Sequence, residues 1–263
     1  MTSKAVLIDT HFHLLAIERK GVDVAQLLAE MGEAGIEGID IGLDSDDLSL
    51  RIERFGKVAG VHFAAGIGPW ALAEGQPPIQ THYARLDSVL STHRPIAIGE
   101  IGLDNHWGYA TQPEQERLLE EQIDRAEQMG LGVIIHNREA DDQFIRLLKR
   151  RRFSKRGIFH CYQGDKELAH LAVDSGFFLS FAGPLTYKAN KTMQSLFAAL
   201  PLSSLLLETD SPYLAPVPLR GTVNTPLSMP HIYRYAAALR SMEEERFSAA
   251  IEANYRVFLA QRS

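Results

Sequence analysis

Short apolar runs alternate along the chain with longer stretches of mixed apolar and polar residues. The runs are rich in Ile, Val, Leu and Phe, which is typical of parallel strands covered by helices on both faces. The eight predicted strands are 5–13, 36–43, 61–67, 96–102, 132–137, 157–162, 177–182 and 204–209.

The stretches between these runs have the periodicity of amphipathic helices. Clear examples are 24–35, 113–130 and 165–176. Pro113 suits the first turn of a helix, and Gly130 and Gly176 suit helix ends. We expect two further helices in the tail 226–263, with a break near 240–242.

Eight strand–helix alternations in a chain of 263 residues predict a (β/α)8 TIM barrel with extra C-terminal helices. No low-complexity linker, charge block or repeat divides the chain, so we expect one domain over 1–263. The alternative is a doubly wound open sheet, in which fewer ligand-bearing strands would meet at one point.

Composition narrows the class of protein. A hydrophobic content of 45% is ample for a large core, and the net charge of −6 provides no global basic field for nucleic acid, although a local patch could still bind phosphate. The single cysteine, Cys161, excludes an intramolecular disulfide and fits a reducing compartment. No run has the length of a signal segment or the roughly 18 apolar residues of a membrane span. We expect a soluble, cytoplasmic protein with no membrane contact, and the sequence predicts no protein partner.

Five of the apolar runs end in residues that bind metal ions. They lie in 7–13, 96–104, 133–140, 157–164 and 205–212. Functional side chains of a barrel sit at the carboxyl ends of its strands, so five such ends predict one metal site.

Four histidines are candidate ligands. His11 and His13 lie on the same side of an extended chain, so both imidazoles can reach one ion; the alternative is a polar pair in a loop. His136 and His160 each end an apolar run, and their matched placement favours ligation over the alternative of hydrogen-bonded core histidines.

Three carboxylates complete the candidate site. Glu100 would lie in the barrel mouth, where a buried charge needs a cation, and a carboxylate can bridge two ions; the alternative is an ion pair with Lys or Arg. Asp210 can bind metal or take a proton from a metal-activated water, or else cap a helix. Glu208 lies one layer deeper, where it would orient a ligand histidine. Cys161 points away from His160, so the expected donors are nitrogen and oxygen only, which suits Zn²⁺, Mn²⁺ or Mg²⁺.

The chain resembles the TatD family of metal-dependent hydrolases, within the amidohydrolase superfamily, over nearly its whole length. The motifs, in the family's order, are Asp-Thr-His-x-His at 9–13, Gly-Glu-Ile-Gly-Leu-Asp at 99–104, Ile-Ile-His-x-Arg at 134–138, Phe-His-Cys-x-x-Gly at 159–164 and Glu-Thr-Asp-Ser-Pro-Tyr at 208–213. The resemblance implies a barrel with one or two divalent ions and deoxyribonuclease activity on DNA or another phosphodiester. It also implies a ligand set, with Glu100 bridging, that consists of His11, His13, Glu100, His136, His160 and Asp210.

Three loops depart from the family's pattern. Gly68 stands where members often have histidine, Asn105-His106-Trp107 replaces an aromatic pair, and the loop at 222–225 lacks a lysine and a glutamate. The metal ligands are therefore retained, whereas the residues that face the substrate differ.

The expected chemistry is hydrolysis of a phosphate ester, with Asp210 and Glu100 as catalytic residues. Arg138 and Arg220 would hold phosphate oxygens, or else form surface salt bridges. Nearby aromatic side chains could stack on bases or simply pack; they are Trp70, Trp107, Tyr109 and Tyr162.

Two other functions stay open. One is a carbon–nitrogen or lactone hydrolase, although no lysine at a ligand-bearing strand end could be carboxylated. The other is a non-catalytic protein that binds metal or nucleic acid, for which six retained ligands would have no chemical purpose.

Overall fold

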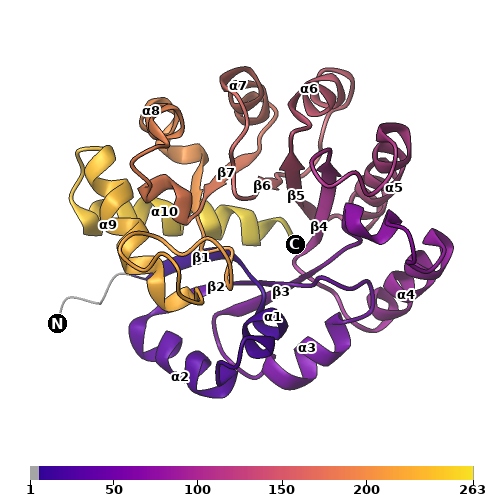
Figure 1. The fold of residues 1–263 in the computed structure, drawn as a ribbon, viewed down its shortest axis with the longest axis horizontal. Helices are drawn as coiled ribbons and strands as arrows, with labels where there is room; N and C mark the ends of the chain where they lie inside the picture. The colour runs from indigo at the N-terminus through magenta and orange to yellow at the C-terminus, as the bar shows by residue number, and fades with distance from the viewer. Residues whose placement is uncertain (1–5, 263) are drawn as a thin grey trace.

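The computed structural model describes residues 6–262, and its centre is a ring of parallel strands surrounded by helices (Figure 1). The strands are β1 (Leu7–Phe12), β2 (Ile36–Ile41), β3 (Val61–Ala65), β4 (Ala97–Asp104), β5 (Gly132–Arg138), β6 (Ile158–Phe159), β7 (Phe178–Phe181) and β8 (Leu205–Leu207). Each strand pairs in parallel with the next one in the sequence.

The ring closes between its first strand and the segment that follows β8. Phe12 forms a parallel bridge with Ser211, the backbone N–H of His13 donates to the Ser211 carbonyl at 2.9 Å, and that of Asp210 donates to His11 at 2.9 Å. The predicted (β/α)8 barrel is therefore confirmed, and the open-sheet alternative is wrong.

The helices alternate with the strands as the sequence pattern predicts. They are α1 (Leu14–Arg19), α2 (Val24–Ala34), α3 (Leu48–Phe55), α4 (Ile79–Thr92), α5 (Gln112–Met129), α6 (Asp141–Arg150), α7 (Lys166–Asp174), α8 (Lys191–Ala199), α9 (Met229–Leu239) and α10 (Glu244–Leu259). Short 3-10 helices occur at η1 (Pro69–Leu72), η2 (Gly183–Thr186), η3 (Leu202–Ser204), η4 (Pro226–Ser228) and η5 (Ala260–Arg262).

Helix α5 shows how local signals set the ends of these elements. Thr111 and Glu114 form a capping box at its start, Pro113 lies in its first turn, and Gly130 ends it with a φ of 65°. Glycine adopts this left-handed conformation at little cost, so the helix stops where the sequence predicts.

Six of the strands are shorter than the apolar runs that indicated them, and β6 and β8 are the shortest of all. β6 stops at Phe159 because Cys161 has a φ of 42°, and β8 stops at Leu207, shortly before Asp210 with a φ of 55°. Both residues turn the chain sharply at the carboxyl end of the barrel. Residue 5 of the first predicted strand lies outside the described residues.

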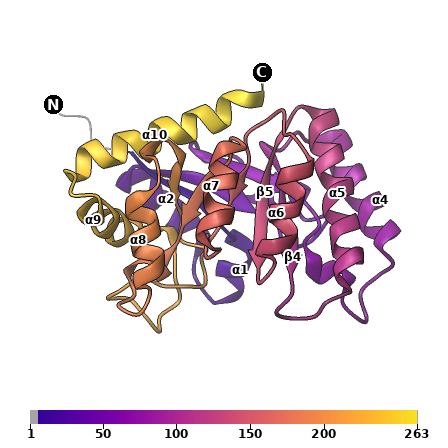
Figure 2. The same cartoon turned by 90° about the horizontal axis from the view of Figure 1, so that it is seen from above.

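Helix α10 covers the amino-terminal end of the barrel, as Figure 2 shows. The Asn254 side chain donates to the carbonyls of Leu202 and Leu205 at 2.8 Å, beside the first residue of β8. The break between α9 and α10 contains Ser241 with a φ of 51°, as expected near 240–242. The opposite end, which we call the mouth, is left to the loops that follow the strands.

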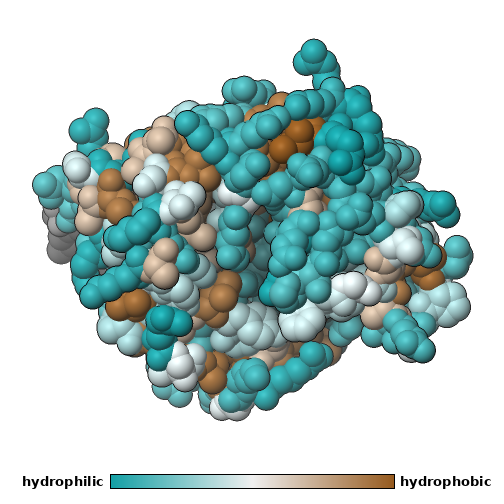
Figure 3. All heavy atoms as spheres, turned by 45° about the horizontal axis from the view of Figure 1, so that its top comes forward, coloured by the Kyte–Doolittle hydropathy of each residue, from teal (hydrophilic) through white to brown (hydrophobic). Residues whose placement is uncertain are grey.

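The surface in the view of Figure 3 is mostly hydrophilic, with apolar atoms in small separate groups. Among residues 6–262, no helix combines the length and apolar character that a membrane crossing requires.

Candidate metal centre

Six side chains from five strand ends meet at the mouth. His11 lies in β1 and His13 directly after it, Glu100 lies in β4, and His136 lies in β5. His160 follows β6 and Asp210 follows β8. Four of them are almost completely buried, which are His11, His13, Glu100 and His160.

Irregular strand pairing positions two of these side chains. The register of β1 against β2 shifts between Asp9 and Phe12, and that of β4 against β5 shifts between Gly99 and Ile101. His11 and Glu100 lie within these irregularities. A bulge of this kind redirects a side chain, which is why such bulges recur beside functional sites.

The first ligand group consists of His11, His13 and Asp210. The Nε2 atoms of the two histidines lie 3.2 Å apart. Asp210 Oδ1 is 3.5 Å from His13 Nε2 and 3.8 Å from His11 Nε2. These three donor atoms therefore face a common point.

The second ligand group consists of His136 and His160, with Glu100 between the two groups. His136 Nδ1 and His160 Nε2 are 3.3 Å apart, and they lie 2.9 and 2.8 Å from Glu100 Oε1. The other oxygen, Oε2, is 3.4 Å from His11 Nε2. One carboxylate thus presents one oxygen to each group.

The donor set fits divalent metal ions. Imidazole nitrogens and carboxylate oxygens converge in a buried space, where the lone pairs repel one another unless protons or cations lie between them. Among residues 6–262, His11 Nδ1 is buried with no hydrogen-bond partner, and the His11 ring stacks on His160 with centroids 3.9 Å apart. His11 Nε2 is the ring nitrogen that faces Glu100 and Asp210 and could bind an ion. The nitrogen and oxygen donors do not choose among Zn²⁺, Mn²⁺ and Mg²⁺.

The two groups perturb each other's protonation strongly. Burial alone would raise the pKa of Glu100, but the charge of His160 and hydrogen bonds from three histidines hold that pKa well below its usual range. Burial lowers the pKa of His160, yet Glu100 and Glu208 together raise it well above the ordinary value. Burial likewise opposes ionisation of Asp210, whose pKa is nevertheless lowered by His13, His11 and His160.

The outer nitrogen of each of three histidines has its own acceptor. His13 Nδ1 is 3.0 Å from the Ile41 carbonyl, and His160 Nδ1 is 3.3 Å from Glu208 Oε1. His136 Nε2 is 3.1 Å from Asp104 Oδ2. Such contacts fix the tautomer, so the opposite nitrogen of each ring presents its lone pair to the centre.

Asp104 is a site residue that the sequence analysis left without a role. Besides its contact with His136, its Oδ1 accepts hydrogen bonds from the backbone of His106 and Trp107 at 3.0 and 3.1 Å. Its position four residues after Glu100 in the same apolar run was a signal that could have identified it.

A buried ion-pair network beneath the first group was also missed. The Arg51 side chain is fully buried, and it donates to Asp47 Oδ1 at 2.8 Å and to Asp40 Oδ2 at 3.1 Å. It also donates to the Ala64 carbonyl at 2.7 Å, so it joins the ends of β2 and β3. The Asp40 carboxylate accepts from the backbone of Leu14, next to His13, at 2.8 Å. Only the spacing of four residues between Asp47 and Arg51 hinted at this network.

The two candidate phosphate-binding arginines lie outside the cluster of ligands. Arg138 and Arg220 are exposed, and no ion pair joins either to a carboxylate in residues 6–262. Arg138 lies over Trp107 at 5.4 Å from the ring centroid, and Arg220 over Tyr187 at 4.3 Å. Both guanidinium groups are therefore held by aromatic rings, and their hydrogen-bond donors are not tied up in salt bridges.

Cys161 takes no part in the ligand groups. Burial and the charges of Asp210 and Glu208 raise the pKa of its thiol well above the usual value, so the thiol is neutral at physiological pH. Its backbone N–H donates to Glu208 Oε1 at 2.7 Å.

Comparison with known proteins gives consistent matches. Residues 8–260 match the family described as TatD related DNase. A protein of Bacillus subtilis strain 168, named as the uncharacterized metal-dependent hydrolase YabD, is 30% identical over 251 residues, which cover 95% of this chain and 97% of that protein. Another, TatD of Mycobacterium tuberculosis, is 28% identical over 257 residues, 95% of this chain and 96% of that protein. The crystal structure of YjjV, a TatD homolog from Escherichia coli K12, superimposes with a TM-score of 0.85 at 27% identity, over 96% of this chain and 97% of that one.

Proposed function

The chain belongs to the family of TatD-related DNases, and on this premise we propose that it is a metal-dependent hydrolase that cleaves phosphodiester bonds in DNA. The observation that carries the proposal is the position of Glu100, whose two oxygens face two separate groups of ligands. A carboxylate between two sets of donors suits a site with two ions, and such sites are common in nucleases and phosphatases.

In this proposal the first ligand group and Glu100 would hold one ion, and the second group and Glu100 would hold the other. Divalent ions supply Lewis acidity there, which activates water at neutral pH and offsets the charge that develops on phosphate. Among residues 6–262 the ion-pair partners of Glu100 are His11, His136 and His160 and include no lysine, which disfavours the amidohydrolase type that is built on a carboxylated lysine.

Asp210 is the residue we assign as proton acceptor. Its side chain is 15% exposed, against 5% for Glu100 and 0% for His11, so it borders the space that a substrate would enter. Its lowered pKa keeps it ionised and able to accept a proton. Arg138 and Arg220 would bind phosphate oxygens next to the scissile bond.

The test is turnover of single-stranded DNA and of bis(p-nitrophenyl) phosphate by the protein loaded with Mg²⁺, Mn²⁺ or Zn²⁺. We expect hydrolysis of both, and a loss of at least about a hundredfold in kcat for Asp210→Asn. The control is Asp174→Asn, an exposed carboxylate at the end of α7, which should leave kcat unchanged.

A protein that binds metal but hydrolyses neither ester would overturn the proposal. Amide and lactone substrates, screened in parallel, separate the two remaining possibilities. Turnover of either would indicate a carbon–nitrogen or lactone hydrolase, and inactivity on all of them would indicate a binding protein.

A further inference from the structure

The chain has two tryptophans, of which one contacts the metal-ligand candidate His136 and the other contacts Arg138, two residues further along β5. Trp70 belongs to η1, after β3, and its ring meets the His136 ring edge-on with centroids 6.1 Å apart. Trp107 follows β4 and contacts Arg138, which ends the strand that carries His136. One side of the mouth, formed by the ends of β3, β4 and β5, is therefore lined with indole rings.

Trp70 occupies the place of the side chain that Gly68 lacks. A Cβ built on Gly68 would overlap the six-membered ring of the indole, so this position of the Trp70 ring requires a glycine at residue 68. The indole N–H donates to the Leu43 carbonyl at 2.9 Å, which fixes the ring against the loop after β2. A flat apolar wall thus stands beside His136.

Trp107 differs from Trp70 because most of it faces solvent. It is 60% exposed, the highest value among the exposed large hydrophobic residues of the described chain. Its backbone N–H is bound by Asp104 Oδ1 at 3.1 Å, and the other oxygen of Asp104 contacts His136. The backbone at Trp107 is thereby linked through Asp104 to His136, and it presents the indole to solvent on the same side of the mouth.

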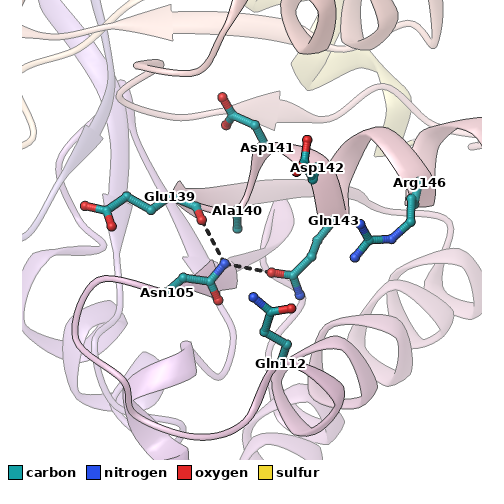
Figure 4. Close-up of a pocket in the computed structure, with 8 residues that line it drawn as sticks. All are labelled: Asn105, Gln112, Glu139, Ala140, Asp141, Asp142, Gln143 and Arg146. Carbon is teal, nitrogen blue, oxygen red and sulfur yellow. Dashed lines mark hydrogen bonds between the residues drawn. The ribbon is translucent and has the colours of Figure 1, made fainter.

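The loop that carries Trp107 is also held by hydrogen bonds from Asn105 to the segment that follows β5. Figure 4 shows the Asn105 amide pointing between Glu139 and Gln143, to which it donates at 2.8 Å each. The cavity beside Asn105 has a volume of about 310 Å³, and its lining includes Glu139, Asp141, Asp142 and Arg146. Its carboxylates repel phosphate, whereas the Arg138 guanidinium over Trp107 attracts it.

We propose that Trp107 and Arg138, next to the wall formed by Trp70, are a nucleobase-binding subsite that selects substrates with an unstacked base adjacent to the scissile phosphate. This inference rests on the proposed phosphodiesterase function. An indole face stacks on any base, and a guanidinium over the same ring adds a charge for the neighbouring phosphate. Asp104 links the backbone at Trp107 to His136 and so connects the loop of this subsite to the metal centre.

The first experiment measures binding without hydrolysis. Trp70→Phe leaves Trp107 as the only tryptophan, so fluorescence reports on it directly. With EDTA present, a thymidine oligonucleotide should quench this fluorescence, and an abasic oligonucleotide of equal length and charge should not. Equal responses to the two oligonucleotides, or no response to either, would overturn the subsite.

The second experiment compares two esters with the same leaving group in the metal-loaded protein. We expect Trp107→Ala to lower kcat/KM about tenfold more for thymidine 5′-(p-nitrophenyl phosphate) than for methyl p-nitrophenyl phosphate, because any effect through Arg138 on phosphate binding is common to both esters. Trp107→Phe, which keeps an aromatic face, should restore most of the loss. An equal loss on both esters would contradict base binding. If neither ester is hydrolysed at all, the proposed function fails, while the fluorescence result still decides the subsite.

Discussion

Asp104 holds His136 from outside the metal centre, with Oδ2 3.1 Å from Nε2, while His136 Nδ1 faces Glu100 at 2.9 Å. The other oxygen of Asp104 binds the backbone of the loop that carries Trp107. One carboxylate therefore sets the tautomer of a ligand and also fixes the backbone of the loop that carries Trp107.

Asp104→Asn should weaken metal binding by roughly 10- to 100-fold, because a neutral amide holds the imidazole less firmly and makes its inner nitrogen less basic. Calorimetric titration with Zn²⁺ or Mn²⁺ measures the change. Asp142→Asn, an exposed side chain at the start of α6, is the control and should bind metal like the parent protein. Unchanged affinity in Asp104→Asn would show that the negative charge of Asp104 does not contribute to metal binding through His136.

Glu100→Gln should reduce the metal content from two ions per chain to one or none. Glutamine keeps the shape of the side chain but removes the charge that faces both ligand groups. Elemental analysis after dialysis measures the stoichiometry, with the exposed Glu139→Gln as the control. An unaltered content of two ions would refute the bridging role.

Arg51→Met should lower the free energy of unfolding by about 3–5 kcal/mol, because Asp40 and Asp47 would remain buried without their cation. Urea titration measures this loss. The matched control is Arg151→Met, whose partners Asp124 and Glu127 are 56% and 36% exposed, so the expected loss there is at most about 1 kcal/mol. Equal losses of unfolding free energy in the two variants would mean that burial does not increase the contribution of the Arg51 ion pairs to stability.

Asp9 should make the metal-free protein less stable as the pH rises. Burial raises its pKa to about 8, although Thr209 donates to it twice and the backbone of His11 once. Between pH ~4 and ~8 the folded protein keeps a proton that the unfolded chain has lost, so stability falls as the pH increases through this window.

Unfolding titrations at several pH values would test this dependence. Asp9→Asn should lose less stability between pH 5 and pH 8 than the parent protein, because the amide does not ionise. Parallel curves for the two proteins would show that Asp9 ionises at its ordinary pKa when the chain is folded.

The ligand candidates could be predicted because each sits in a short motif at the end of its own apolar run. Their meeting point followed from the barrel, whose carboxyl strand ends share one face. Arg51 could not be predicted in this way, since its partners come from the ends of two different strands and the loop between α3 and β2. The burial of Arg51 depends on the assembled fold, so the apolar and polar residues around it in the sequence hardly indicate it.

Loop geometry was equally invisible in the sequence. From the sequence, Gly68 could only be interpreted as the absence of the histidine that family members often have. The structure shows that the Trp70 ring fills the space beside Gly68. The ends of β6 and β8 were also predicted too late, and the turns that follow these strands contain Cys161 and Asp210, which have positive φ angles although neither is a glycine. Tertiary contacts at the mouth impose these conformations, so propensity alone does not reveal them.

Helix α10 closes the barrel at the end where β1 begins, so both ends of the described chain emerge on the face away from the ligands. A surface attachment made through either end would therefore hold the molecule with its mouth directed outward. If the protein were attached to a surface in this way, a polymeric ligand in solution could still reach the mouth. A partner protein fused to either end would likewise leave the space above Asp210 open.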